Sequence, residues 1–306
     1  MPALRHYLHL HFIVFIWGFT AILGLLLEPL GTPALVVWRT GLAALGLAVV
    51  VAARLGQPPA GAPPLTSRQR TSDRRRMLAT GGLIALHWFT FFLAARLANA
   101  SVCLAGMATS SLWASVLEPL LLKRAINRLE VLMGAVVLLG LYLIFRFEFD
   151  KGLGLAVAVF SAMLGALFTI INSGFAQRHD SLQISALEMG GAFLTSLLFF
   201  PFLAGLVPGH GPVVWAELLP QRPDQWLWLG VLAFVCTVYA YTAGLGLLRR
   251  FSPYMAILTI NLEPVYGILL AVLIFNDRER MTPGFYVGTL VILLAVLAYP
   301  FLAKKE

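Results

Sequence analysis

Residues 253–275 read PYMAILTINLEPVYGILLAVLIF, a run in which Glu263 is the single charged side chain. About 20 mostly apolar residues suffice for an α-helix to cross the hydrocarbon core of a membrane. A carboxylate inside such a run is costly to insert and therefore indicates a functional site. The stretch predicts a membrane span that carries a buried acid, followed directly by the helix-breaking Pro264.

Nine further apolar runs of similar length flank this stretch, and each ends at charge, glycine or proline. The ten predicted spans are 8–27, 33–53, 77–97, 100–122, 131–145, 152–176, 182–206, 225–248, 253–275 and 283–302. The first run continues to residue 27 without a small-residue cleavage site, which predicts a retained anchor rather than a cleaved signal peptide. The expected fold class is an all-α membrane protein with ten transmembrane helices.

The composition supports a membrane protein and argues against a nucleic-acid binder. Of the 306 residues, 59% are hydrophobic and 12% charged, and the mean hydropathy is +0.85. A soluble domain has about 25% charged residues, because water must wet its surface. The net charge of +8 comes from basic residues spread over short loops, so the predicted partner is the lipid bilayer and no nucleic acid is expected.

The same basic residues orient the spans. With the N-terminus inside, 15 Lys and Arg residues fall in cytoplasmic segments and 6 in outer loops, with Arg39 inside a span. The positive-inside rule then places both termini in the cytoplasm and the chain in the inner (plasma) membrane as a multi-pass protein. Residues 56–76, rich in Pro, Gly, Ser and Arg, predict a flexible cytoplasmic loop whose basic end lies against anionic headgroups.

The chain also contains an internal repeat. Leu117-Glu118-Pro119 in the fourth predicted span matches Leu262-Glu263-Pro264 in the ninth. The predicted halves are 1–150 and 151–306, with five spans each. Because five is odd, the second half must enter the membrane from the opposite side, and such inverted repeats are typical of secondary transporters.

Ten spans in a 5+5 arrangement, Trp17-Gly18, Arg39 and the two Leu-Glu-Pro motifs together resemble the EamA-like branch of the drug/metabolite transporter superfamily. The resemblance covers nearly the whole chain and rests on short motifs. It implies a ten-helix fold and the export, less often the uptake, of amino acids or related metabolites. One departure is that Glu118 lies five residues before Lys123 whereas Glu263 lies near mid-span, so the two acids are not expected to have equal roles.

Four charged side chains lie inside predicted spans: Arg39, Glu118, Glu188 and Glu263. Glu263, nearest the midplane, is the leading candidate for a carboxylate that loads and releases a proton as access alternates. The competing interpretation is that Glu263 only breaks the helix and pairs with backbone or with Asn261. Glu118, one turn from the cytoplasm, is expected to be structural. Arg39 and Glu188 fall in opposite membrane halves, so no direct bridge between them is expected.

Polar and aromatic side chains add further candidates. His87 and Trp88 lie in the middle of the third span, and Asn172 lies on one face of the sixth with Ser161, Gly165 and Thr169. Small polar faces also serve helix packing in membranes, so packing and cavity lining both remain open for them. The predicted substrate-binding or coupling residues are Glu263, His87, Trp88, Asn172, Tyr239, Arg39, Glu188 and Trp17.

Missing motifs narrow the function. No GxxxxGK[ST] phosphate loop occurs, which argues against ATP as the energy source. Cys103 and Cys236 lie in apolar segments without metal-ligand spacing and are expected to be buried thiols. We therefore expect no catalytic residue, cofactor or metal.

The sequence predicts a secondary active transporter, an exporter of amino acids or similar small metabolites by alternating access with proton coupling. The alternatives are a multi-pass membrane enzyme acting on lipid intermediates and a structural or sensory membrane protein. Whether the chain forms a homo-oligomer is left open.

Overall fold

The computed structural model describes residues 3–28, 30–53, 65–205 and 215–302, and these residues form helices without a β-strand. The α-helices are α1 (Leu4–Gly18), α2 (Thr20–Leu26), α3 (Thr32–Ala53), α4 (Ser67–Leu97), α5 (Ala100–Met107), α6 (Ser110–Leu122), α7 (Arg128–Phe147), α8 (Gly152–Ala176), α9 (Ser181–Leu198), α10 (Phe200–Gly205), α11 (Pro223–Gly230), α12 (Ala240–Leu247), α13 (Pro253–Ile260), α14 (Glu263–Phe275) and α15 (Pro283–Leu302). Short 3-10 helices are η1 (Phe149–Lys151), η2 (Trp215–Leu218) and η4 (Asn276–Glu279), and η3 (Val231–Tyr239) is a π-helix.

Eight helical stretches in the described residues are long and apolar enough to cross a membrane. They are Leu4–Leu26, Thr32–Ala53, Ser67–Leu97, Ala100–Leu122, Arg128–Phe147, Phe149–Ala176, Pro223–Leu247 and Pro253–Phe275. The predicted spans 182–206 and 283–302 also form helices, α9–α10 and α15, but fall outside these eight. A helix satisfies its backbone polar groups internally, which is why apolar runs of this length fold as helices in lipid.

Three of the candidate spans are interrupted near their middle. α1 gives way to α2 at Phe19, α5 to α6 at residues 108–109, and α13 to α14 at residues 261–262. Side-chain hydroxyls bind carbonyls at two of the breaks: Thr20 donates to Trp17 O at 2.6 Å, and Ser110 to Met107 O at 2.7 Å. Backbone that leaves the helical pattern at membrane depth needs such partners, so the breaks are built into the sequence.

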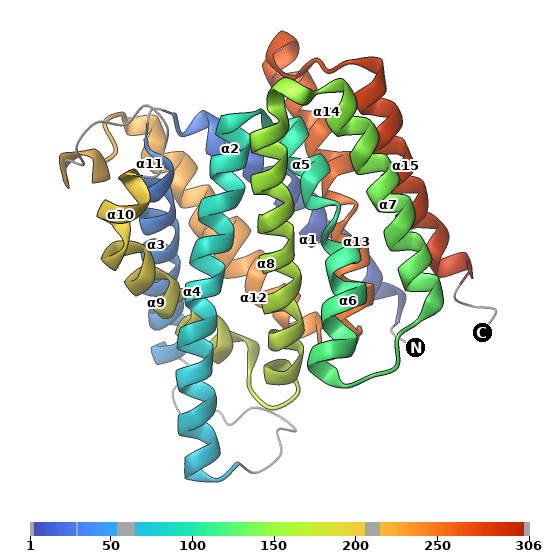
Figure 1. The fold of residues 1–306 in the computed structure, drawn as a ribbon. Coiled ribbons are helices and arrows are strands. Elements are labelled where there is room, and N and C mark those ends of the chain that lie inside the picture. The colour runs from blue at the N-terminus through green and yellow to red at the C-terminus, as the bar shows by residue number, and fades with distance from the viewer. Residues whose placement is uncertain (1–2, 29, 54–64, 206–214, 303–306) are drawn as a thin grey trace.

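The basic segment before the third predicted span is helical, not a loop. α4 begins at Ser67, where Thr66 caps it by accepting a hydrogen bond from Gln69 N, and it projects beyond the neighbouring helices (Figure 1). The expected loop at 56–76 is therefore wrong from residue 67 onward, because a cap and good helix formers continue the span outward. Residues 54–64 lie outside the described part.

Close helix packing at small residues holds the bundle together. At Gly81 of α4 a Cβ would meet the carbonyl of Glu188, and at Gly191 of α9 a Cβ would meet the carbonyl of Leu78. The pair α7 and α15 meets in the same manner at Gly140 and Gly288. Small residues at such crossings let backbones approach closely, which drives helix association in membranes.

The two Leu-Glu-Pro motifs do not occupy matching places. Glu263 is the first residue of α14, directly after a break, whereas Glu118 and Pro119 lie within α6. α5 and α13 both contain 8 residues, and α6 and α14 both contain 13. Ser110 is the first residue of α6, as Glu263 is the first residue of α14.

Candidate functional site

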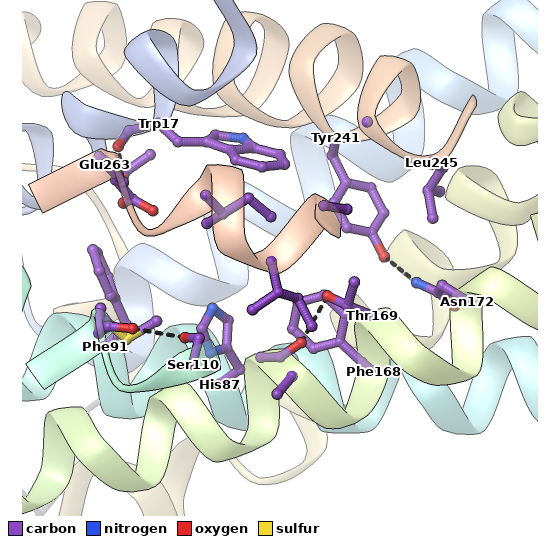
Figure 2. A pocket seen from close by; sticks show the side chains of 18 of the residues that line it. Trp17, His87, Phe91, Ser110, Phe168, Thr169, Asn172, Tyr241, Leu245 and Glu263 are labelled. Atoms are coloured by element: carbon purple, nitrogen blue, oxygen red, sulfur yellow. Dashed lines mark hydrogen bonds between the residues drawn. The ribbon is translucent and has the colours of Figure 1, made fainter. Parts of the chain in front are cut away.

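A cavity of about 120 Å³ lies where the three breaks meet. Its lining includes Trp17 and Thr20 from the first break, Met107 and Ser110 from the second, and Ile260 and Glu263 from the third. Figure 2 shows side chains arriving from several helices, with Trp17, Tyr241 and Glu263 on some and His87, Ser110 and Asn172 on others. Interrupted helices that frame a cavity at membrane depth are typical of solute-binding sites in transporters.

Arg39 of α3 supplies a buried cation to this cavity. Its guanidinium carbon lies 3.8 Å from the centroid of the Trp88 ring, and Nε donates to the Thr237 hydroxyl at 3.0 Å. Among the described residues, no carboxylate lies within 4.0 Å of its nitrogens. The arginine is thus held by an aromatic face and a hydroxyl, and its charge is not neutralised by an acid at contact distance.

The π-helix η3 positions both Arg39 and Trp17. Its Thr237 hydroxyl donates to Leu232 O at 2.9 Å while accepting from Arg39. The indole nitrogen of Trp17 donates to Cys236 O at 3.1 Å. A π-helix displaces backbone carbonyls from the α-helical register, which explains how two successive residues of one helix can hold two different side chains of the cavity.

Glu263 lies at the cavity wall with 7% of its surface exposed. Among the described residues no basic nitrogen lies within 4.0 Å of its carboxylate. The groups that act on this acid are the Thr20 hydroxyl, which is its hydrogen-bond partner, and the more distant charge of Arg39. The acid is therefore not held by an ion pair.

His87 is fixed by hydrogen bonds to α8. Its Nδ1 lies 2.9 Å from the Ser161 carbonyl oxygen, and the Ser161 hydroxyl donates to the His87 carbonyl at 2.8 Å. A carbonyl oxygen can only accept, so this contact places the ring hydrogen on Nδ1. The Phe168 ring packs edge-on against the imidazole at 5.2 Å between centroids.

Asn172, Tyr241 and Glu188 form one buried network. The Tyr241 hydroxyl donates to Glu188 Oε2 at 2.7 Å, and the Asn172 amide donates to the Tyr241 oxygen at 2.9 Å. Asn172 and Tyr241 line the cavity, whereas Glu188 lies behind them. No Arg39–Glu188 bridge is present, as expected from their depths.

The structure brings six of the eight sequence-predicted residues to the cavity wall: Trp17, Arg39, His87, Trp88, Asn172 and Glu263. Glu188 reaches the cavity through Tyr241. Tyr239 does not line it, because 43% of its surface is exposed and its hydroxyl lies 3.1 Å from His9 Nε2. Residues two positions apart lie on nearly opposite faces of a helix, so Tyr241 faces the cavity and Tyr239 faces away from it.

Other cavity residues were missed as site candidates: Tyr241, Thr20, Ser110 and Phe168. Thr20 and Ser110 lie at helix breaks that the hydropathy pattern does not reveal, since no proline marks them. The sequence feature that could have indicated these residues is a hydroxyl side chain within an apolar run.

Glu118 and the two cysteines are the other groups that the sequence singled out inside the predicted spans. Glu118 pairs with Arg124 at 3.2 Å, away from the cavity, which agrees with a structural role for it. Cys103 and Cys236 are free and buried, as predicted. Within the described residues no three His, Cys, Asp or Glu side chains are grouped so as to hold a metal ion.

An all-helical bundle of apolar spans, around a mostly apolar and aromatic cavity with a few polar groups, defines a polytopic membrane protein. Residues 152–299 match the model of the EamA-like transporter family. This family is part of the drug/metabolite transporter superfamily, and the match over the second half of the chain agrees with the resemblance that the motifs indicated. A solved structure titled only "Crystal structure of protein" has a TM-score of 0.66 and 15% identity, and the alignment covers 99% of both chains, so the two share a fold. No curated protein matches the sequence.

Proposed function

We propose that the chain is a secondary active transporter that exports amino acids or related small metabolites by alternating access, with proton coupling. The observation that carries the proposal is the cavity itself, which a cation and an acid, Arg39 and Glu263, line together with aromatic rings. An engineered cavity of about 150 Å³ accommodates benzene, so a volume of about 120 Å³ suits a small solute.

Arg39 is the proposed anchor for a solute carboxylate. Its charge faces a site without a contacting acid, and a guanidinium binds a carboxylate through two parallel hydrogen bonds. Glu263 offers the opposite charge to an amino group or a proton. Trp17, Trp88 and Phe91 would enclose the apolar part of the solute.

Alternating access requires two halves that can exchange roles, and the packing supports this. We pair each helix of the first half with one of the second: α1 with α8, α3 with α9, α4 with η3–α12, α5 with α13, α6 with α14 and α7 with α15. Under this pairing, the contacts between helices come in matching pairs. The contact of α4 with α9 matches that of α3 with η3, and the contact of α6 with α8 matches that of α14 with α1. The contact of α5 with α14 likewise matches that of α13 with α6, and the contacts of α3 with α9 and of α7 with α15 map onto themselves. Such pairing favours two inverted halves, 1–150 and 151–306, and ten spans.

Two left-handed helix ends support the same correspondence. Lys123, with φ of 54°, ends α6, and Asn276, with φ of 46°, ends α14. They are the only non-glycine residues with positive φ in the described part of the chain. The family match also begins at residue 152, close to the proposed boundary between the halves.

The proposed location is the inner membrane with both termini in the cytoplasm. The beginning of α1, the end of α15 and the basic projection of α4 lie at one end of the bundle (Figure 1). Five arginines lie on that projection: Arg68, Arg70, Arg74, Arg75 and Arg76. The positive-inside rule assigns this end to the cytoplasm.

The test uses purified protein in liposomes without ATP. A labelled amino-acid mixture is placed on one side, and a pH gradient is imposed across the membrane. We expect accumulation that a protonophore abolishes, and solute exchange that persists without the gradient. Protein-free liposomes give the background. If no amino acid or related metabolite moves above that background in either orientation, the transport proposal is wrong.

A further inference from the structure

Glu188 of α9 is an acid buried directly behind the cavity wall. None of its surface is exposed. Among the described residues no Lys, Arg or His nitrogen lies within 4.0 Å of its carboxylate. An ionised, unpaired carboxylate at this depth is expensive. The side chains around Glu188 must therefore explain how a buried carboxyl group is stabilised without an ion pair.

The hydrogen bonds of this network leave two oxygens without a donor. Oε2 of Glu188 accepts from Tyr241 at 2.7 Å and from Asn172 at 3.4 Å. Oε1 of Glu188 and Oδ1 of Asn172 are buried and have no partner. Both atoms are acceptors, and they belong to two groups that already touch, so the network lacks a donor hydrogen.

A proton on Glu188 supplies that donor. Oε1 then carries a hydrogen that a nearby acceptor such as Asn172 Oδ1 can receive, while Oε2 keeps its bond from Tyr241. Buried polar networks are stable when every member is satisfied and costly when one is not. With Glu188 ionised, two buried acceptors lack a donor. With Glu188 protonated, Oε1 becomes a donor and can satisfy Asn172 Oδ1, so neither oxygen is left unpaired.

No charged side chain compensates for Glu188 from the helices packed against it. α12 contributes the tyrosine hydroxyl of Tyr241, and α8 contributes the neutral Asn172. On α3 the charged residue facing the interior is Arg39, which is held by Trp88 and Thr237. On α4 the titratable residue at this depth is His87, which is bound to Ser161.

We propose that Glu188 is a proton-binding site distinct from Glu263, and that Tyr241 links its protonation to the occupancy of the cavity. When Glu188 is ionised, the single Tyr241 hydrogen is given to Oε2. When Glu188 is protonated, Oε2 keeps this bond in the empty cavity but is a weaker acceptor, so an acceptor group of a bound solute can compete with it for the Tyr241 hydrogen. One proton enters from one aqueous side and the same proton leaves to the other. The link to transport rests on the proposed function, whereas proton binding does not.

The experiment measures the proton directly, by pH-difference infrared spectroscopy of purified protein in detergent without solute. Wild type should show a carboxyl C=O band that titrates, Glu188→Gln should lack it, and Glu263→Gln should retain it. Tyr241→Phe removes a donor to the ionised acid, so the band should persist with a midpoint about one pH unit higher. Tyr239→Phe, which changes the neighbouring tyrosine on the outer surface, is the matched control and should leave the midpoint unchanged.

Three results would overturn the proposal. One is a wild-type band that survives unchanged in Glu188→Gln. Another is an identical midpoint in Tyr241→Phe and Tyr239→Phe, which remains decisive even if Glu188→Gln cannot be purified folded. The third is loss of the band on adding NaCl at constant pH, which would identify a metal cation as the ligand. Liposomes that fail to transport any solute would contradict the proposed function while leaving this band in place.

Discussion

The guanidinium carbon of Arg39 lies 3.8 Å from the centroid of the Trp88 ring, inside a membrane-depth cavity and without a carboxylate in contact. A desolvated cation–π contact of this kind is worth about 2 kcal/mol. It holds the arginine in place without neutralising its charge. An anionic solute group would meet a cation that is already positioned.

Replacing Arg39 with lysine should weaken solute binding while the protein stays folded. Lysine keeps the charge but loses the planar fork that binds a carboxylate bidentately and stacks on an indole. We expect the half-saturation concentration for transport to rise on the order of tenfold to a hundredfold. Arg222→Lys, at an exposed arginine paired with Asp224, is the control and should transport normally. Equal kinetics in the two variants would remove Arg39 from solute recognition.

The crossing of α4 and α9 should tolerate no side chain at Gly191. A Cβ there would collide with backbone atoms of Leu78, which cannot move away as a flexible side chain can. Gly191→Ala should therefore cost about 1–3 kcal/mol or more of stability, seen as a lower Tm and less folded protein in detergent. The adjacent Gly190 meets nothing within 4 Å, so Gly190→Ala should be neutral or slightly stabilising. A Tm for Gly191→Ala equal to that of Gly190→Ala would contradict this packing.

The helices could be predicted from the sequence because a membrane span is set by length and hydropathy, which are local properties. Eight of the ten predicted segments overlap helices that meet those criteria, two of them running one residue past the end of the helix. The helical start of α4 was mispredicted because polar and basic residues are read as loop. A cap at Thr66 and a dense run of arginines continue the helix into water instead.

Site residues could be predicted where a charged or imidazole side chain lies inside a span, because burying such a group is costly. They were harder to predict where the helix geometry decides which face a residue occupies. Arg39, Glu263 and His87 stood out because charge or imidazole inside a span is rare, and all three line the cavity. Tyr239 was predicted for the site, whereas the cavity is lined by Tyr241, which lies two residues further on and on the opposite face of the helix. The shared Leu-Glu-Pro motif does not show where a helix breaks, because Glu263 begins α14 whereas Glu118 lies within α6.

Glu148, at the end of α7 and outside the spans, should give the protein an acid-sensitive contact. Burial acts to raise the pKa of Glu148, but hydrogen bonds from the backbone and hydroxyl of Thr282, together with Lys151, outweigh it, and the pKa lies below its ordinary value. A lowered folded-state pKa means that the contact stabilises fully above about pH 4.3, the ordinary value for glutamate, and is lost as pH falls through the lower value.

Glu148→Gln should thus lower the Tm by a few degrees at pH 7, and this difference from wild type should shrink below pH 4. Thermal unfolding in detergent across pH measures it. Asp150→Asn, two residues further along the chain, is the matched control and should show no such pattern. A Tm difference that stays constant down to pH 3 would mean that Glu148 contributes by shape and not by charge.

The orientation of the chain can be tested with two new cysteines. Ser72 is exposed on the α4 projection, and Gln221 is exposed before α11. The native thiols Cys103 and Cys236 are buried and should stay silent. In intact cells an impermeant maleimide should label Gln221→Cys alone, and Ser72→Cys should react only after the membrane is opened. Labelling of both from outside would contradict ten spans with cytoplasmic termini.

Glu263→Gln is the sharpest test of coupling at the cavity. Glutamine keeps the shape and hydrogen-bonding atoms of the acid at the start of α14 but cannot ionise. We expect proton-driven accumulation in liposomes to collapse while solute exchange across the membrane survives, because exchange does not require the proton to be released. Glu118→Gln, at an acid that pairs with Arg124 outside the cavity, is the control and should accumulate solute nearly as well as wild type. If Glu263→Gln keeps full pH-dependent accumulation, Glu263 only supports the helix break, and the coupling proton must be carried elsewhere, with Glu188 the first residue to examine.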